Sequence, residues 1–333
     1  MTGLLLAAVI APASYKFDAA TKQNFKLEAV FEGFLPILGG NEGKAEIMMG
    51  VAVKGQSPDE AKLKASNEIT AFELKFNGAK LPFGLESVQD YFPKTNIVIQ
   101  PTGKIVKTDA PDKTLPVRLP GLDIKRFPDI TYVPIELPDG TLAVGSKWNF
   151  KKNFGGEDIN YTCEATKVSE TAAEIAVNIT QEYEVMENEG LEIVTKEADA
   201  VAKVKTTMVG TGKVYFNLTL GLPDHVIMKN DSTSAVTQIK SGEKSTRKLV
   251  TTFKVTREGA AKIDGLVVKA KATVPPKDLA GAASMVWDST VKFGQDLWVG
   301  ANQKLQLAKM LAFVLWQNIP GLGSKFMNWL AIK

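Results

Sequence analysis

The sequence has almost none of the two side chains that carry out most chemistry at neutral pH. Its 333 residues include one histidine, His225, and one cysteine, Cys163. Histidine has a pKa near neutrality, and cysteine supplies a thiolate nucleophile. Their scarcity excludes His-rich zinc sites, four-cysteine metal clusters, disulfide scaffolds and any histidine-based triad that does not use His225. The sequence therefore predicts no cofactor and favours a non-enzymatic role.

The chain also lacks an excess of charge of one sign. Forty Lys and Arg residues against 37 Asp and Glu residues give a net charge of +3, and no basic cluster stands out. A nucleic-acid partner needs a concentrated basic face, so none is predicted. A hydrophobic content of 44% is that of a globular chain, and the length allows roughly two domains.

Residues 1–14 resemble a secretory signal. Residues 3–11 are uncharged and apolar, and Ala11-Pro12-Ala13 matches the small-residue pattern of a cleavage site. No basic residue precedes Leu4, which departs from the usual signal, and the alternative is a buried N-terminal strand. We expect export to the periplasm, cell envelope or extracellular space, with a mature chain that starts near Ser14 or Tyr15.

Residues 15–108 are predicted to form an N-terminal β lobe. Apolar and polar residues alternate at period two in residues 22–31, 44–53 and 68–76, which is typical of half-buried strands. Residues 96–108 predict a hairpin, and residues 85–92 a short helix.

Residues 109–140 form a proline-rich connector that contains six of the 16 prolines. Proline lacks an amide hydrogen and disfavours a helical residue before it, so this stretch is expected to be extended and outside any ladder. It either links two lobes or crosses one of them as a strap. Long irregular connections are often functional, so the segment is also a candidate for shaping a groove.

Residues 141–274 predict a second β lobe, a meander of antiparallel strands. Short alternating segments are separated by Asn188-Glu189-Gly190, Gly210-Thr211-Gly212 and Ser241-Gly242-Glu243. Many strands at short spacing with little helix favour a curved or closed antiparallel sheet. The glycines at 210 and 212 are predicted to form a turn between strands at residues 200–209 and 213–220.

Residues 275–333 predict an amphipathic helical tail with four of the five tryptophans. Such a stripe is too apolar to remain in water and must cover the sheet, a partner or a bilayer surface. A transmembrane span is not expected, because Lys309, Asn318 and Pro320 interrupt the apolar run. The candidate docking residues of this tail are Trp287, Trp298, Leu305, Phe313, Trp316, Phe326 and Trp329.

Motifs that resemble catalytic sites have structural interpretations. Asp224 and His225 are adjacent on a predicted strand and point to opposite faces, so they cannot act as a pair. Cys163 alternates as a small core residue. Neither Ser241-Gly242-Glu243-Lys244 nor Gly210-Thr211-Gly212-Lys213 has the surrounding motifs of an acyl-transfer or phosphate-binding site.

The expected fold is mainly β with a helical C-terminus: an antiparallel meander, curved or half-barrel, in one or two lobes, on which the C-terminal helical segment packs. This plan resembles exported lipoprotein-carrier proteins, in which a curved antiparallel sheet wraps apolar ligand against helices. The resemblance lies in the architecture, with no shared motif. We predict an exported, non-enzymatic, β-rich cell-envelope protein that binds an apolar small molecule or an envelope protein.

Two alternatives stay open at this point. One is a carboxylate-dependent hydrolase with Asp and Glu side chains in a groove. The other is a peripheral envelope scaffold whose C-terminal helix contacts the membrane.

Overall fold

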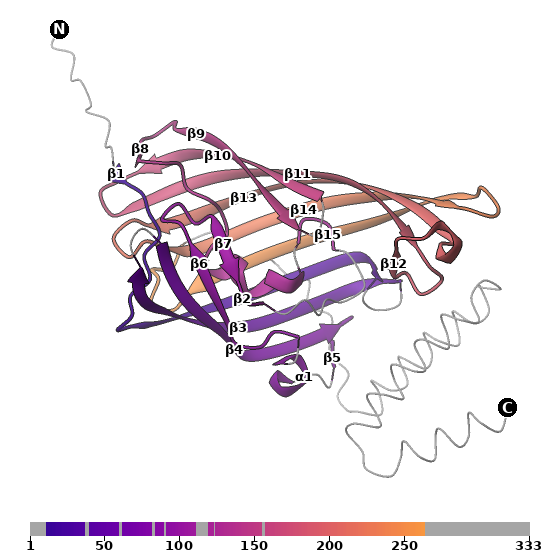
Figure 1. Ribbon diagram of the computed structural model, residues 1–333, viewed down its shortest axis with the longest axis horizontal. Coiled ribbons are helices and arrows are strands. Elements are labelled where there is room, and N and C mark those ends of the chain that lie inside the picture. Colours follow the sequence, from indigo (N-terminus) through magenta and orange to yellow (C-terminus); the bar gives the residue numbers. More distant parts are fainter. Residues whose placement is uncertain are drawn as a thin grey trace, which may run out of the picture.

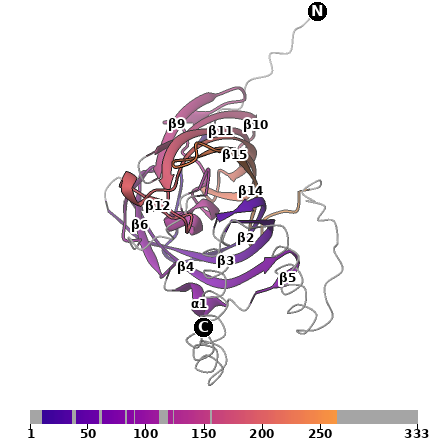
Figure 2. The same cartoon turned by 90° about the vertical axis from the view of Figure 1, so that its right-hand side faces the viewer.

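The computed structural model describes residues 11–36, 40–59, 62–81, 84–89, 91–110, 119–122, 124–154 and 157–263. Within them the dominant element is one antiparallel sheet of 13 strands. The sheet is strongly curled, so that its first and last strands approach each other across the hollow side (Figures 1 and 2). The prediction of a mainly β, curved antiparallel fold is confirmed.

The first half of the sheet comes from the N-terminal part of the chain, as predicted from its period-two alternation. The short helix α1 (Leu85–Gln89) lies between its strands and contacts β4. The strands are β2 (Lys22–Leu35), β3 (Asn41–Asp59), β4 (Lys62–Phe76), β5 (Ala79–Lys80), β6 (Thr95–Ile99) and β7 (Ile105–Thr108).

The second half of the sheet consists of strands between residues 147 and 257, within the region 141–274 for which a meander is predicted. A 3-10 turn, η3 (Glu197–Asp199), precedes β13. The strands are β9 (Lys147–Phe154), β10 (Glu157–Val168), β11 (Ala172–Glu187), β12 (Ile193–Val194), β13 (Ala202–Asn217), β14 (Leu222–Gln238) and β15 (Lys244–Arg257).

The two halves are joined by the pairing of β15 with β2. The strand order is β7-β6-β4-β3-β2-β15-β14-β13-β11-β10-β9, and every step except β15-β2 is between strands that follow each other closely in the chain. In this pairing Leu249 lies opposite Gly33, and Arg257 lies opposite Phe25. The two expected lobes are therefore halves of one continuous sheet.

The proline-rich segment crosses the inner face of the sheet. Its residues 119–140 include the 3-10 segment η2 (Ile124–Thr131), and they end at β8 (Thr141–Leu142). They contribute several side chains to the main core: Leu119, Leu122, Phe127, Tyr132, Val133, Ile135 and Leu137. We call residues 119–140 the strap. The β6–β7 and β13–β14 turns lie at one end of the sheet, which we call the strap end. The β2–β3 and β14–β15 turns mark the far end.

The N-terminal residues also pack at the strap end. The short strand β1 (Ala11–Pro12) pairs with β8, and Ala13 donates its amide N–H to the Gly140 carbonyl at 3.3 Å. Ala13 and Tyr15 are buried. Residues 11–13, which match the pattern of a cleavage site, are thus incorporated in the fold. Residues 1–10 lie outside the described residues.

The turn predicted at Gly210-Thr211-Gly212 is wrong, because β13 runs through it without interruption. Gly210 pairs with Ile179 on one side and Asn230 on the other. A Cβ on Gly210 would collide with the Asn230 side chain, and a Cβ on Gly212 would lie 2.7 Å from Met228 Cγ. The glycines serve close approach within a strand, rather than a turn.

Candidate functional site

The inner face of β3 and β4 carries apolar side chains that the strap does not fully cover. Strand pairing places Ile47 opposite Leu74, Met49 opposite Phe72 and Ala45 opposite Phe76. Ile47, Phe72, Leu74 and Phe76 are half-buried and pack on the main core. These four residues are called the inner apolar patch. Towards the strap end, the inner side chains Val51 and Val53 are buried completely or nearly so.

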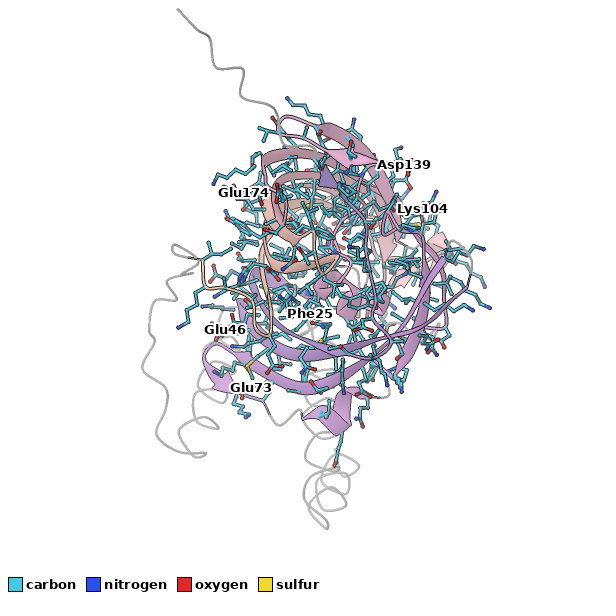
Figure 3. The ribbon with its side chains drawn as sticks, turned by 90° about the vertical axis from the view of Figure 1, so that its left-hand side faces the viewer. Phe25, Glu46, Glu73, Lys104, Asp139 and Glu174 are labelled. Carbon is cyan, nitrogen blue, oxygen red and sulfur yellow. The ribbon has the colours of Figure 1, made fainter. Side chains whose placement is uncertain are left out.

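Period-two alternation explains why these residues share a face. Successive side chains of a strand point to opposite sides of the sheet, so Met48 and Glu73 lie on the outer face beside Ile47 and Leu74. Figure 3 shows Phe25 inside the curl, whereas Glu46, Glu73 and Glu174 lie on its outer side. The alternation of residues 68–76 is evident in the sequence, but nothing in the sequence indicates that their inner side is incompletely covered.

The strap is fixed to both margins of the sheet at the strap end. Trp148 of β9 donates from Nε1 to the Glu136 carbonyl at 2.8 Å. From the opposite margin, the Thr102 carbonyl in the β6–β7 turn accepts the Leu137 amide N–H at 2.7 Å. The buried Tyr15 hydroxyl donates to the Ile135 carbonyl at 2.7 Å. The strap thereby bridges two edges that do not pair with each other, and it occupies the inner space at this end.

Lys152 of β9 adds a charged contact to the strap. Its Nζ donates to the carbonyls of Val133 and Pro134, each at 3.1 Å, and lies 5.6 Å from the centroid of the Tyr161 ring. Burial lowers the pKa of Lys152 to about 8, although the negative charge of Glu136 acts in the opposite direction. Burial also raises the pKa of the Glu136 carboxyl, against the attraction of Lys152. The pair is partly desolvated and holds the strap to the edge strand.

A second buried polar group lies between the strap and β4. The Tyr132 hydroxyl donates to Asp129 Oδ1 at 2.6 Å, and Asn67 Nδ2 donates to the Tyr132 oxygen at 2.6 Å. Burial, followed by the nearby Asp129 charge, raises the pKa of Tyr132 well above its ordinary value. Each buried group has a partner, which is the usual requirement for burial of polar side chains. This cluster orients the strap on the sheet.

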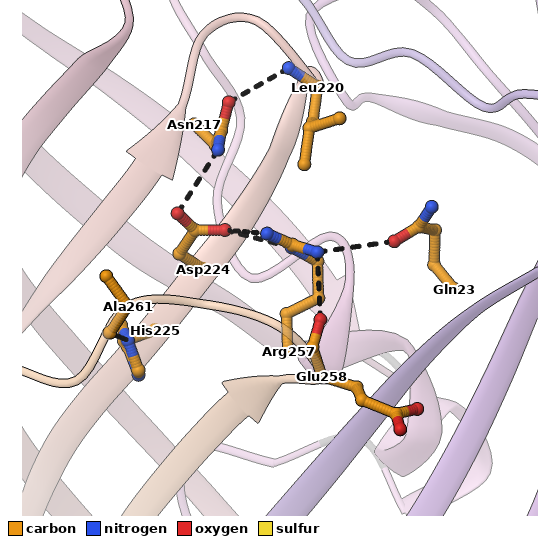
Figure 4. A network of polar contacts seen from close by, with 8 residues as sticks. All are labelled: Gln23, Asn217, Leu220, Asp224, His225, Arg257, Glu258 and Ala261. Atoms are coloured by element: carbon orange, nitrogen blue, oxygen red, sulfur yellow. Dashed lines mark hydrogen bonds and ion pairs between the residues drawn. The ribbon is translucent and has the colours of Figure 1, made fainter.

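Asp224 and His225 take part in different contacts in the structure (Figure 4). Asp224 accepts hydrogen bonds from Arg257, whereas His225 Nε2 lies 2.7 Å from the Ala261 carbonyl. The two side chains thus have different hydrogen-bond partners. Cys163 is buried, and its burial raises the pKa of the thiol to about 12, which disfavours the thiolate form at neutral pH.

A hollow of about 330 Å³ lies at the strap end. Phe17, Leu63 and Leu220 supply apolar surface there, and Lys16 and Asp18 are among the polar residues that line it. Lys16 donates from Nζ to the carbonyl of Thr219 at 3.3 Å. The hollow is bordered by turns and holds no cluster of convergent catalytic groups among its lining residues.

Other expectations of the sequence fall partly outside the structure. The seven candidate docking residues, Trp287, Trp298, Leu305, Phe313, Trp316, Phe326 and Trp329, lie beyond residue 263 and outside the described residues. In the described ranges, no three or more His, Cys, Asp or Glu side chains are grouped so that they could hold a metal ion. None of the helices among the described residues has the length and apolarity needed to cross a bilayer.

No family model matches the chain, and no curated protein matches it. Among solved structures, one that describes lipid–protein interactions in lipovitellin is similar, with a TM-score of 0.42 and 13% sequence identity. The similarity covers 79% of this chain and 27% of the lipovitellin chain, so this chain spans about a quarter of that length. A similarity of this size does not place the chain in the lipovitellin family.

Proposed function

We propose that this protein binds an apolar ligand on the inner face of its curled sheet, at the inner apolar patch. The observation that supports the proposal is the contrast along one face of the same strands. Near the strap, Val51 and Val53 are buried, but Ile47 and Leu74 stay partly open on the side that normally forms a core. Apolar surface on a concave face is a common feature of ligand sites.

The strap limits the form that this binding takes. Tyr132, Ile135 and Leu137 occupy the inner face at the strap end and are buried there. A ligand would therefore lie against the patch near the far end, rather than run through the whole curl. Its binding free energy would come from removing apolar surface from water, at about 25 cal/mol per Å².

The test compares two leucine-sized positions on opposite faces of neighbouring strands. In the full chain, Leu74→Gln places an amide in the inner apolar patch, and Met48→Gln places the same amide on the outer face. Binding is measured by titration with the neutral apolar fluorophore Nile red. An amide that has no hydrogen-bond partner against the bound ligand costs about 1–2 kcal/mol, so Leu74→Gln should weaken binding about 5- to 30-fold.

Met48→Gln is the matched control and should bind as the unmodified protein does, because Met48 is already 36% exposed on the outer face. Thermal unfolding of both variants checks that the sheet is intact. Failure of the unmodified protein to bind the fluorophore, or equal weakening in both variants, would refute the proposal. Organic extraction of the purified protein followed by mass spectrometry would identify an apolar molecule that co-purifies with it.

The sequence adds three further parts to this proposal. They are export to the cell envelope, an envelope protein as partner, and membrane contact through the C-terminal helix. The carboxylate-dependent hydrolase has no specific support among the described residues. Asp129 is bound to Tyr132, and Glu187 is paired with Arg247 at 2.6 Å. We therefore favour ligand binding over hydrolysis.

A further inference from the structure

A small cavity of about 40 Å³ lies near the far end, where the end of β2 meets β11, β13, β14 and β15. It differs from the inner apolar patch because most of its polar lining can donate hydrogen bonds. The side chains that matter for its chemistry are Phe34, Glu187, Thr206, Ser234, Arg247 and Leu249.

Arg247 is the main donor at this cavity. Its Nη1 donates to Glu187 Oε2 at 2.6 Å, and its guanidinium carbon lies 4.4 Å from the centre of the Phe34 ring. The Arg247 side chain is only 17% exposed. A guanidinium has five N–H groups, and among the described residues no acceptor is assigned to Nε or Nη2. Arg247 can therefore bind a second oxyanion while it keeps Glu187.

A pair of hydroxyl groups adds a further donor. The Thr206 and Ser234 oxygens lie 2.8 Å apart on neighbouring strands, and either can donate to the other. Only one of the two protons is used in that bond, so the second is free for an acceptor in the cavity. Thr206 is 1% exposed, so any such acceptor must come from a group that enters the cavity.

Donor geometry and size restrict what this group can be. Of the charged residues in the lining, Arg247 and Glu187 face the cavity, whereas Lys248 is the next residue on β15 and is exposed on the outer face. The Nε–Nη2 edge of Arg247 is the part of the guanidinium that has no assigned acceptor among the described residues. A cavity of about 40 Å³ has room for a group of the size of one or two water molecules. A carboxylate is small enough and matches the planar fork of the Nε–Nη2 edge through two parallel hydrogen bonds, whereas a phosphocholine or sugar head group is too large.

We propose that this cavity binds the carboxylate of a long-chain amphiphile whose hydrocarbon tail lies on the inner apolar patch. The inference rests on the proposed function and specifies its ligand class. Leu249 pairs with Gly33, which pairs with Gly43 of β3, four residues before Ile47. Arg247 is two residues further from Ile47 than Leu249 is, so two strand spacings of about 4.8 Å and six residues of about 3.3 Å separate the two parts by roughly 22 Å. A long alkyl chain can span this distance.

The test compares hexadecanoic acid with hexadecanol, which share the same chain and differ in the charged head. Each is titrated against Nile red bound to the full-length protein, and displacement gives its Kd. The unmodified protein should bind the acid at least tenfold more tightly than the alcohol. In the double variant Glu187→Gln/Arg247→Gln, which leaves no single charge unpaired, the acid should bind no more tightly than the alcohol.

The matched control is Lys254→Gln, which removes one positive charge from the outer face of the same strand and should keep the preference for the acid. The inference is overturned if the unmodified protein binds acid and alcohol equally, or if the double variant keeps the preference. Those results leave the proposed function intact, because both ligands still bind. If neither compound displaces the fluorophore and the fluorophore itself does not bind, the proposed function fails and the inference fails with it.

Discussion

Lys152 donates from Nζ to the Val133 carbonyl at 3.1 Å and so connects the edge strand β9 to the strap. The contact places an ammonium group where it is largely removed from water, against the Tyr161 ring. Its cost should be visible as a pH dependence of stability. The strap is thus held in part by a group whose charge is unfavourable in its surroundings.

The first prediction concerns that pH dependence. The pKa of Lys152 is about 8 in the folded protein, against an ordinary value of 10.5. Between these values the unfolded chain keeps a proton that the folded chain has released, so stability rises with pH. The unfolding free energy of the unmodified protein relative to Lys152→Met should increase by up to about 2 kcal/mol between pH 7 and about pH 10. Urea unfolding at several pH values measures it.

Lys151→Met is the control for this experiment. Lys151 precedes Lys152 on β9, so its side chain points to the other face of the sheet. It is 65% exposed and lies beside Asp158. Because the Lys151 side chain is exposed, its replacement should change the free energy of unfolding by less than about 1 kcal/mol. If the difference in unfolding free energy between the unmodified protein and Lys152→Met does not change with pH, Lys152 is solvated in the folded state.

The second prediction uses two glycines with nearly the same backbone conformation. Gly103 has φ +92° and Gly140 has φ +94°. A Cβ on Gly103 would press on the Tyr15 ring and lie 3.1 Å from the Ile135 carbonyl oxygen, whereas one on Gly140 would meet nothing within 4 Å. Both Ala substitutions carry the cost of positive φ, about 1 kcal/mol. Gly103→Ala should cost a further 1–3 kcal/mol or so from overpacking.

Chemical denaturation of the two alanine variants measures this difference. Because the backbone cost is shared, the excess in Gly103→Ala reports the packing of the strap against Tyr15 and the β6–β7 turn. Equal destabilisation of the two variants would mean that this contact is loose.

The third prediction concerns Arg257 and Asp224, which connect β15 with β14 at the strap end (Figure 4). Arg257 donates to Asp224 Oδ1 from Nε at 2.9 Å and from Nη2 at 2.6 Å. The two side chains are 9% and 23% exposed. Asp224→Ala or Arg257→Met alone should cost about 2–4 kcal/mol, because each leaves a partly buried charge without its partner.

The double variant should lose less than the sum of the two single changes, with a coupling of about 1–3 kcal/mol. The exposed pair of Lys22 and Glu68, with side chains 48% and 41% exposed, is the comparison. Lys22→Met should change stability by less than about 1 kcal/mol. If the double variant loses as much stability as the two single variants together, the contact between Arg257 and Asp224 contributes no interaction free energy.

Much of the sheet could be predicted from local pattern. The alternation of residues 22–31 identified the core of β2, and the Asn188-Glu189-Gly190 turn lies where β11 ends. The error at Gly210 and Gly212 has a physical origin. A glycine pair can form a turn or admit a neighbouring side chain, and the occupant here, Asn230, is 20 residues away from Gly210 in the chain.

The candidate site could be predicted only in part. The alternation that ends with Phe72, Leu74 and Phe76 defines a face, but exposure of that face depends on where the strap lies. Arg247 and Glu187 are 60 residues apart in the chain, and no local pattern indicates that they meet. The tail residues that the sequence favoured as docking positions lie outside the described part of the chain, so their role stays a prediction.

The sequence by itself determined the class of structure, the position of most strands and the scarcity of histidine and cysteine, because these depend on composition and on period-two alternation within a few residues. Only the tertiary structure decided that β15 pairs with β2 and that the strap fills one end of the curl. Those features depend on contacts between distant segments, and a strand's alternation specifies which face is apolar without specifying what will cover it.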